Sequence, residues 1–329
     1  GDHRDLHSFP TRRSSDLKKS NAQIAREFDA AMNPAGTLGV FTTAKDRSTE
    51  LRDAVRAHAG NGTANGLWAQ VTGGKTKLKG ISTGAQDLDL DTDAYGLAVG
   101  GEAALQNITL GAAFMGGSGK TENDSVAGKD DFNYYGISFY AKTQVQGIDL
   151  EGDVSAAWLK SDLTVGGAAD VDTDTTTAVY SLGIQAKKTF NLGVDVTPFI
   201  GMDVYHIKSD GFTTNHGVSI EDANATIVEF PIGAEVKKAL QTSSGFSVAP
   251  SFSLAVVPTV GCKDIDSKVR FAGAESTYNF TFADDVKVRS QLGIEAQKDN
   301  FTLGLAAGYD WGNEERSAAS VQLRAKYAF

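Results

Sequence analysis

Two histidines lie close to carboxylates in one segment of the chain. His206 and His216 flank a long loop, with Asp203, Asp210 and Glu221 nearby. A carboxylate that orients a histidine, or accepts its proton, is a common arrangement for hydrolysis. His206, however, falls at the same alternating positions as the neighbouring apolar residues, so an interfacial position for its ring explains the pattern better than catalysis does.

Acidic residues recur at every second position in two other stretches. Asp149, Glu151 and Asp153 share one face of a strand, where they could transfer a proton or bind a cation. Because many basic residues fall on the same face of the other strands, a solvated lattice of mixed charges is the better interpretation. The other stretch could supply oxygen ligands to calcium, but an exposed acidic loop accounts for it more simply. It contains Asp87, Asp89, Asp91 and Asp93.

A glycine-rich segment resembles part of a phosphate-binding loop. Residues 116–121 read GGSGKT, but the full spacing and the following helix of such a loop are missing. We therefore expect a loop tip here. Cys262 is the single cysteine, which excludes an intramolecular disulfide and a thiolate metal cluster. The sequence predicts no catalytic residue, no cofactor and no metal site.

The elements that position these residues are predicted to be strands. Residues 321–329 read VQLRAKYAF, and alternate side chains of a strand point to opposite faces. In a closed membrane barrel the apolar face would meet lipid and the terminal aromatic would lie in the interfacial girdle. A half-buried strand of a soluble sandwich is the alternative. The apolar face consists of Val321, Leu323, Ala325, Tyr327 and Phe329.

Twelve segments with this period of two lie between residues 67 and 329. Short turns follow the even-numbered segments, and long loops rich in Gly, Asp, Thr and Lys follow the odd-numbered ones, as at residues 74–92 and 261–285. Tight turns on one side and long loops on the other are typical of outer-membrane barrels. The predicted fold class is all-β, a twelve-stranded antiparallel transmembrane β-barrel.

The inward faces of these strands carry many charges. Burial costs on the order of several kcal/mol per ion, so we expect a water-filled lumen in which each ion pair contributes at most about 1 kcal/mol. Inward glycines indicate either the close approach of another backbone or curvature of the wall. The residues expected to face the lumen include Glu102, Glu151, Asp153, Asp203, Glu235, Arg289 and Arg324.

Composition narrows the possible partners. The net charge of −10 argues against nucleic acid. Glycine is abundant, with 36 residues in 329, whereas proline is scarce, with 6. No run of 18 apolar residues occurs, so no transmembrane helix is predicted.

The region before the first strand has two parts. Residues 7–17 read HSFPTRRSSDL, which resembles the translation of a sequencing adapter, so residues 1–17 are excluded from fold reasoning. Residues 18–64 are expected to form a linker with a mostly polar helix at about residues 46–59, and residues 65–329 the barrel. This helix could be exposed to solvent or thread a polar pore. In a pore, inward acids would meet Arg47, Arg52 or Arg56.

The order of these segments resembles the translocator domain of autotransporters over residues 66–329. The segments that carry the resemblance are GLWAQVTGG at 66–74, YGLAVGGE at 95–102, DLEGDVSAAWLKSD at 149–162 and LRAKYAF at 323–329. The family implies a twelve-stranded barrel in a Gram-negative outer membrane, a helix that plugs its lumen, and a secreted passenger N-terminal to the helix. It also implies that the barrel assembly machinery recognises the last strand. The linker lacks the Asn-Asn pair that some members use for self-cleavage.

From this resemblance we expect an outer-membrane pore through which the chain exports its own passenger, by passive transport and without enzymatic activity. The expected partners are the lipid bilayer, the assembly machinery and the passenger. The long loops would be extracellular, and the N-terminal and C-terminal ends of the barrel domain would both be periplasmic. A self-contained barrel acting as an adhesin or porin-like protein is the alternative, and a hydrolase at the barrel rim is a third possibility.

Overall fold

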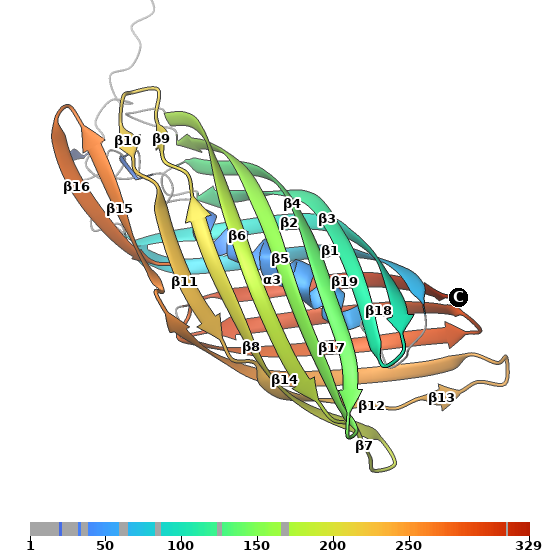
Figure 1. Cartoon of the computed structure of the whole chain (residues 1–329). Coiled ribbons are helices and arrows are strands. Elements are labelled where there is room, and N and C mark those ends of the chain that lie inside the picture. Colours follow the sequence, from blue (N-terminus) through green and yellow to red (C-terminus); the bar gives the residue numbers. More distant parts are fainter. Residues whose placement is uncertain are drawn as a thin grey trace, which may run out of the picture.

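The dominant feature of the computed structural model is a closed antiparallel barrel around one helix, α3 (Figure 1). The structure describes residues 20–21, 32–33, 39–58, 65–82, 87–123, 127–165, 171–313 and 315–329. The adapter-like segment at residues 1–17 lies outside this range. Twelve strands surrounding an N-terminal helix confirm the predicted fold class.

The helix and the barrel strands have the following bounds. They are α3 (Val40–His58), β1 (Gly66–Ser82), β2 (Asp87–Leu105), β3 (Ile108–Asn123), β4 (Gly128–Val145), β5 (Ile148–Val165), β6 (Val171–Lys187), β8 (Asp195–Ser209), β11 (Ala223–Glu229), β12 (Ile232–Lys237), β14 (Ser247–Gly261), β17 (Val286–Lys298), β18 (Phe301–Gly312) and β19 (Ser317–Ala328). Two short pieces, β7 (Phe190–Asn191) and β13 (Leu240–Gln241), extend hairpins of the same sheet.

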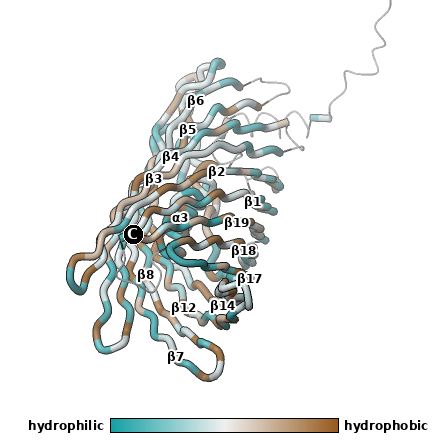
Figure 2. The backbone as a smooth tube through the Cα atoms, turned by 90° about the vertical axis from the view of Figure 1, so that its right-hand side faces the viewer, coloured by the Kyte–Doolittle hydropathy of each residue, from teal (hydrophilic) through white to brown (hydrophobic). Residues whose placement is uncertain are grey.

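The first and last strands close the barrel. β1 pairs with β2 on one side and with β19 on the other, and Leu67 lies opposite Tyr327. Hydrophobic and hydrophilic residues alternate along the strands (Figure 2). The large apolar residues of the outward-facing set are exposed. Leu292 is 63% exposed and Leu323 56%. An exposed apolar band around a closed sheet is suited to contact with lipid tails.

β11 and β12 occupy the place of the eighth predicted strand, which the structure divides at Phe230 and Pro231. Both halves pair with β8 and with β14. Proline has no amide hydrogen for the ladder, so the strand is interrupted there. The amide of Gly201 instead donates to the Pro231 carbonyl at 2.8 Å.

The two ends of the barrel differ. One end, here called the short-turn end, has turns such as Gln106–Asn107 and Gln146–Gly147 and the C-terminus. At the other, the long-hairpin end, paired strands continue where long loops were expected. β1 and β2 pair from Gly66 to Ser82, with Lys75 and Asp91 forming a cross-strand ion pair at 3.2 Å. The GGSGKT segment lies within β3 and is not a loop tip, because its backbone pairs with β2 and β4.

A separate small sheet also lies at the long-hairpin end. It contains β9 (Phe212–Thr213), β10 (Ser219–Ile220), β15 (Asp264–Phe271) and β16 (Ala274–Thr281), in the order β16-β15-β10-β9. The segments were expected to be loops. A turn at Ala272 and Gly273, with φ of 50° and 84°, instead allows residues 264–281 to form a hairpin. No helix among the described residues is long and apolar enough to cross a membrane.

Candidate functional site: the helix in the barrel lumen

α3 begins six residues before the expected start at residue 46, because its first turn packs against β16 and the segment that follows β16. The ring of Phe41 lies 6.3 Å from that of Phe280 and 5.9 Å from that of Phe282. The Thr42 hydroxyl donates to the Phe282 carbonyl at 2.8 Å. Tertiary packing therefore extends the helix over residues that the sequence had assigned to the linker.

The C-terminal end of α3 is held by residues of β19 and β1. Lys326 donates from Nζ to the His58 carbonyl at 3.1 Å and also bonds Glu102. A cation at a helix C-terminus interacts favourably with the partial negative charge of the last carbonyls. The His58 ring stacks on Trp68 with 4.4 Å between ring centroids. The helix thus extends from the long-hairpin end to the short-turn end.

Two arginines of α3 meet two aspartates of the wall. Arg52 Nε lies 3.2 and 3.0 Å from the two carboxylate oxygens of Asp153. Arg56 makes a bidentate contact with Asp203, at 2.6 and 3.0 Å. The Arg52 guanidinium also lies over the Tyr205 ring, 4.6 Å from its centroid. Bidentate pairing fixes both the position and the rotation of the helix.

Glycines of the wall make room for these contacts. Gly183 lies between Asp153 and Asp203 in the ladder, and a Cβ there would be 2.7 Å from Arg52 Nε. A Cβ on Gly136 would be 3.0 Å from Leu51 Cδ2. At these two positions glycine allows the helix to approach the wall closely. Other inward glycines instead lie under aromatic side chains, as Gly111 lies under Tyr140.

A second charged cluster lies near the N-terminal end of α3. Glu229 Oε1 accepts from Lys45 at 2.5 Å and from Lys287 at 2.9 Å. Asp46 pairs with Arg316 at 2.5 Å. These contacts tie α3 to β11, to β17 and to Arg316 just before β19, so the helix is held from several sides.

The expectation of a uniformly water-filled lumen is wrong for the side where α3 lies against β4, β5, β6 and β8. There the side chains of Arg52 and Asp153 are each 1% exposed. On the other side a polar cavity of about 700 Å³ separates α3 from β12, β14 and β17–β19, and its lining includes Arg289, Gln291 and Arg324. The helix occupies the lumen asymmetrically, so pairs on the dry side are buried.

The remaining predicted lumen residues lie in different surroundings. Glu151 pairs with Lys187 at 3.5 Å, and Arg289 reaches Asp53 of α3 at 3.2 Å. Glu235 and Arg324 line the cavity, and Arg324 donates to Gln322. Arg47 pairs with Glu50 of its own helix at 2.5 Å, not with an acid of the wall.

The sequence did not predict three of the contacts that hold α3 in the lumen, those of Lys45, of Arg316 and of His58 with Trp68. Lys45 was excluded because the predicted helix began one residue later, and Arg316 because the last strand was predicted to begin at residue 321. The stacking of His58 on Trp68 has no local signature, since the two residues lie on separate elements. Lys45 belongs to the helix because packing of the first turn, and not the polarity of the sequence, determines where α3 begins.

The arrangement expected of a rim hydrolase is absent from the described residues. Asp203 points into the barrel and binds Arg56, whereas His206 is exposed on the outer face and bonds Thr226 at 2.9 Å. His216 lies in the turn between β9 and β10. The described part of the chain contains no group of three or more residues that could hold a metal ion.

The apolar set of the last strand lies on the outside of the barrel. Tyr327 and Phe329 are 50% and 65% exposed, with ring centroids 6.4 Å apart. The amide of Phe329 donates to the Asn65 carbonyl at 3.0 Å, which continues the β1–β19 ladder past the end of both strands. The terminal aromatic therefore lies beside the beginning of β1, at the short-turn end.

The comparisons with known proteins agree with this geometry. The sequence profile of the family described as Autotransporter beta-domain matches residues 67–310. The fold resembles the translocator domain of NalP from Neisseria meningitidis, at 14% identity, with 88% of this chain and 97% of that chain covered and a TM-score of 0.69. It also resembles the transport unit of AIDA-I from Escherichia coli, at 14% identity, 87% and 98% coverage and a TM-score of 0.59. The β-domain of Bordetella BrkA has 15% identity, 81% and 100% coverage and a TM-score of 0.58. No curated protein matches the chain.

Proposed function

Because the chain belongs to the autotransporter β-domain family, we propose that it is an outer-membrane translocator that exports the polypeptide preceding its own barrel. The observation that carries this proposal is the path of the chain through the lumen. Residues 39–58 run inside the barrel from the long-hairpin end to the short-turn end, and β1 then enters the wall at Gly66. A polypeptide upstream of α3 would therefore already lie at the long-hairpin end, on the side of the barrel opposite to the start of β1.

The orientation follows from the hairpins. In outer-membrane barrels short turns face the periplasm and longer connections face outward. We assign the long-hairpin end to the cell exterior and the short-turn end to the periplasm. The first residue of β1 and the C-terminus, which both lie at the short-turn end, then face the periplasm. The passenger would then leave at the mouth where Phe41 contacts Phe280 and Phe282.

Two further partners follow from the outer surface. The exposed apolar band fits the lipid bilayer. The last strand, with Phe329 exposed at its end, fits recognition by the barrel assembly machinery before membrane insertion. The barrel itself contributes a passage and anchoring contacts, and the transport is passive.

Surface display tests this function directly. A reporter domain fused upstream of residue 20 should become accessible to protease added to intact cells, and the barrel should remain in the outer-membrane fraction. A matched chain with Leu292→Arg on the lipid face should lose both properties. A correctly inserted barrel whose reporter stays in the periplasm would contradict translocation and favour a self-contained adhesin or porin-like barrel.

A further inference from the structure

The turns at the short-turn end differ in charge around the barrel. The turns at residues 106–107 and 146–147 contain no charged residue. Three other turns follow β6, β12 and β17, and together they contain three lysines and one aspartate, at residues 188–194, 238–246 and 298–300. These turns are neighbours, because β6, β8, β12, β14 and β17 follow one another in the sheet. Positive charge is therefore concentrated on one side of this rim, here called the basic arc. The basic arc consists of Lys188, Lys238 and Lys298.

The lysines of the basic arc face outward, away from the lumen. Residues directly opposite each other in an antiparallel ladder share a face of the sheet. The Lys188 amide donates to the carbonyl of the exposed Pro198 at 3.2 Å, and the Lys238 amide donates to that of the exposed Pro250, also at 3.2 Å. Lys298 lies opposite an exposed aromatic residue of β18. All three exposed lysines thus belong to the surface that meets the membrane and not to the passage.

The charge of the basic arc is not neutralised by the described part of the protein. Two lysines that directly precede members of the arc point into the lumen and find acids there. Lys187 pairs with Glu151 at 3.5 Å, and Lys237 pairs with Glu295. The three lysines of the arc point the other way, and no carboxylate of the described residues forms an ion pair with any of them. They are therefore available to a negatively charged ligand outside the barrel.

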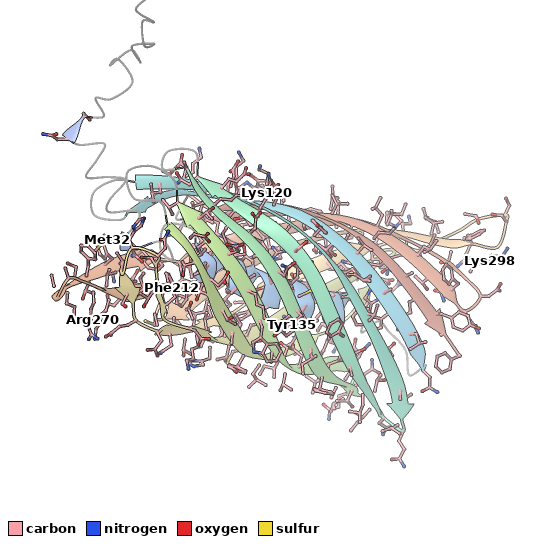
Figure 3. All side chains as sticks on the ribbon, turned by 90° about the horizontal axis from the view of Figure 1, so that it is seen from above. Met32, Lys120, Tyr135, Phe212, Arg270 and Lys298 are labelled. Carbon is pink, nitrogen blue, oxygen red and sulfur yellow. The ribbon has the colours of Figure 1, made fainter. Side chains whose placement is uncertain are left out.

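Exposed aromatic side chains lie beside the basic arc. The Lys188 Nζ is 5.5 Å from the centroid of the Phe190 ring, and the Lys298 Nζ is 5.0 Å from that of the Phe246 ring. Figure 1 shows the β7 and β13 hairpins projecting from the barrel, and Figure 3 shows Lys298 at the end of the molecule remote from Met32. At a membrane interface, aromatic rings and lysine stems lie against acyl chains while the ammonium group remains among the head groups.

We propose that the basic arc binds the head groups of anionic phospholipids in the leaflet around the short-turn end, with the apolar side chains beside it in contact with the acyl chains. A phosphodiester carries the negative charge that these ammonium groups attract, and basic residues next to a membrane-spanning segment attract anionic lipids in this way. Leu192 and Leu240, 74% and 47% exposed, extend the apolar surface of the same turns. A soluble acidic protein would leave these leucines in water. The inference rests on membrane insertion of the barrel and goes beyond export.

Lipid selectivity in vesicles tests the proposal. The full chain is reconstituted in phosphatidylcholine vesicles with a trace of spin-labelled phosphatidylglycerol or spin-labelled phosphatidylcholine, and the fraction of label immobilised at the protein surface is compared. The unsubstituted chain should bind the labelled phosphatidylglycerol several-fold more strongly. The Lys188→Gln/Lys298→Gln variant should lose most of this preference. The Lys188→Arg/Lys298→Arg variant retains the charge and should retain the preference, which separates charge from packing.

Lys160→Gln/Lys208→Gln is the matched control, because both lysines are exposed and lie toward the long-hairpin end of β5 and β8. This variant should keep the full preference. An equal loss in both glutamine pairs would overturn the proposal, since the effect would then reflect net charge alone. If the unsubstituted chain shows no preference in vesicles free of other proteins, the proposal is also wrong and the arc is left to a protein partner.

Ionic strength provides a measurement that needs no substitution. Added salt should weaken the preference of the unsubstituted chain for phosphatidylglycerol, because screening reduces the attraction between exposed charges. A preference that salt does not change would contradict recognition by the lysines. Heat-modifiable migration establishes that each variant is folded. None of these measurements requires export, so a failure of surface display would contradict the translocator function without bearing on lipid binding.

Discussion

Gly183 of β6 lies so close to Arg52 of α3 that a Cβ at this glycine would be 2.7 Å from the Arg52 Nε. The same added atom would be 2.4 Å from Asp153 Oδ1. The position of Gly183 between two aspartates of the wall therefore allows two arginines of the helix to reach them. The anchoring of the helix at Asp153 and Asp203 thus depends on this one wall position.

Gly183→Ala should displace the helix without unfolding the barrel. The added methyl group forces apart Arg52 and Asp153, so the amides of α3 should exchange with deuterium faster. Gly304→Ala is the matched control, because its Cβ would meet its nearest atom at 3.4 Å, in the cavity-facing wall. Equal exchange rates in both variants would show that close approach at Gly183 does not anchor the helix.

Asp153→Asn should lower the free energy of unfolding far more than the removal of an exposed carboxylate does. Both members of the Arg52–Asp153 pair are buried, and removing one partner of a buried pair costs about 3–5 kcal/mol. Asp91→Asn on β2 removes a carboxylate paired with the half-exposed Lys75 and should cost at most about 1 kcal/mol. Denaturant unfolding of α3, followed by a fluorophore on the helix, measures the difference. Similar costs would mean that water reaches the buried pair.

The faces of β17 can be tested with adjacent substitutions. Leu292→Arg places a cation against lipid tails and should cost about 2–4 kcal/mol near the bilayer midplane. Gln291→Arg should be tolerated, since Gln291 lines the polar cavity. Heat-modifiable migration on gels reports folding of each barrel. Equal folding of the two variants would contradict the assigned register.

Deletion of Phe329 should reduce outer-membrane yield more than its lost contact area explains. This follows if the assembly machinery recognises the terminal aromatic. Phe246→Ala, another exposed aromatic, is the comparison for a loss of apolar contact alone. Comparable yields of the two variants would mean that Phe329 acts only as an aromatic residue at the membrane interface and is not recognised by the assembly machinery.

The sequence was sufficient to predict the barrel because alternation of apolar and polar residues is a local property. It identified the outward face of β17 and the strand count. It could not locate the break at Pro231 or the sheet containing β16, since both depend on pairing between segments far apart in the chain. The helix start depended on Phe41 packing against Phe280 and Phe282, which no local pattern reveals.

The sequence predicted that ion pairs form in the lumen, but it did not predict that some of these pairs are buried. Arg52 and Arg56 were expected to meet inward acids, and Asp153 and Asp203 were among the candidates. Their burial was not predicted, because charge patterning does not indicate how closely a helix approaches the wall. That distance depends on small residues such as Gly183 and Gly136, where a Cβ would meet side chains of the helix.

Single-channel conductance tests the central claim that the chain passes through the lumen and leaves α3 there. The measurement compares the full chain with a chain lacking residues 18–59, each reconstituted in planar bilayers. The shortened chain should fold, as judged by heat-modifiable migration, and should conduct substantially more current because the helix no longer fills the passage. A folded barrel with unchanged conductance, and with Arg52 of the full chain accessible to bulky reagents added from outside, would contradict the account.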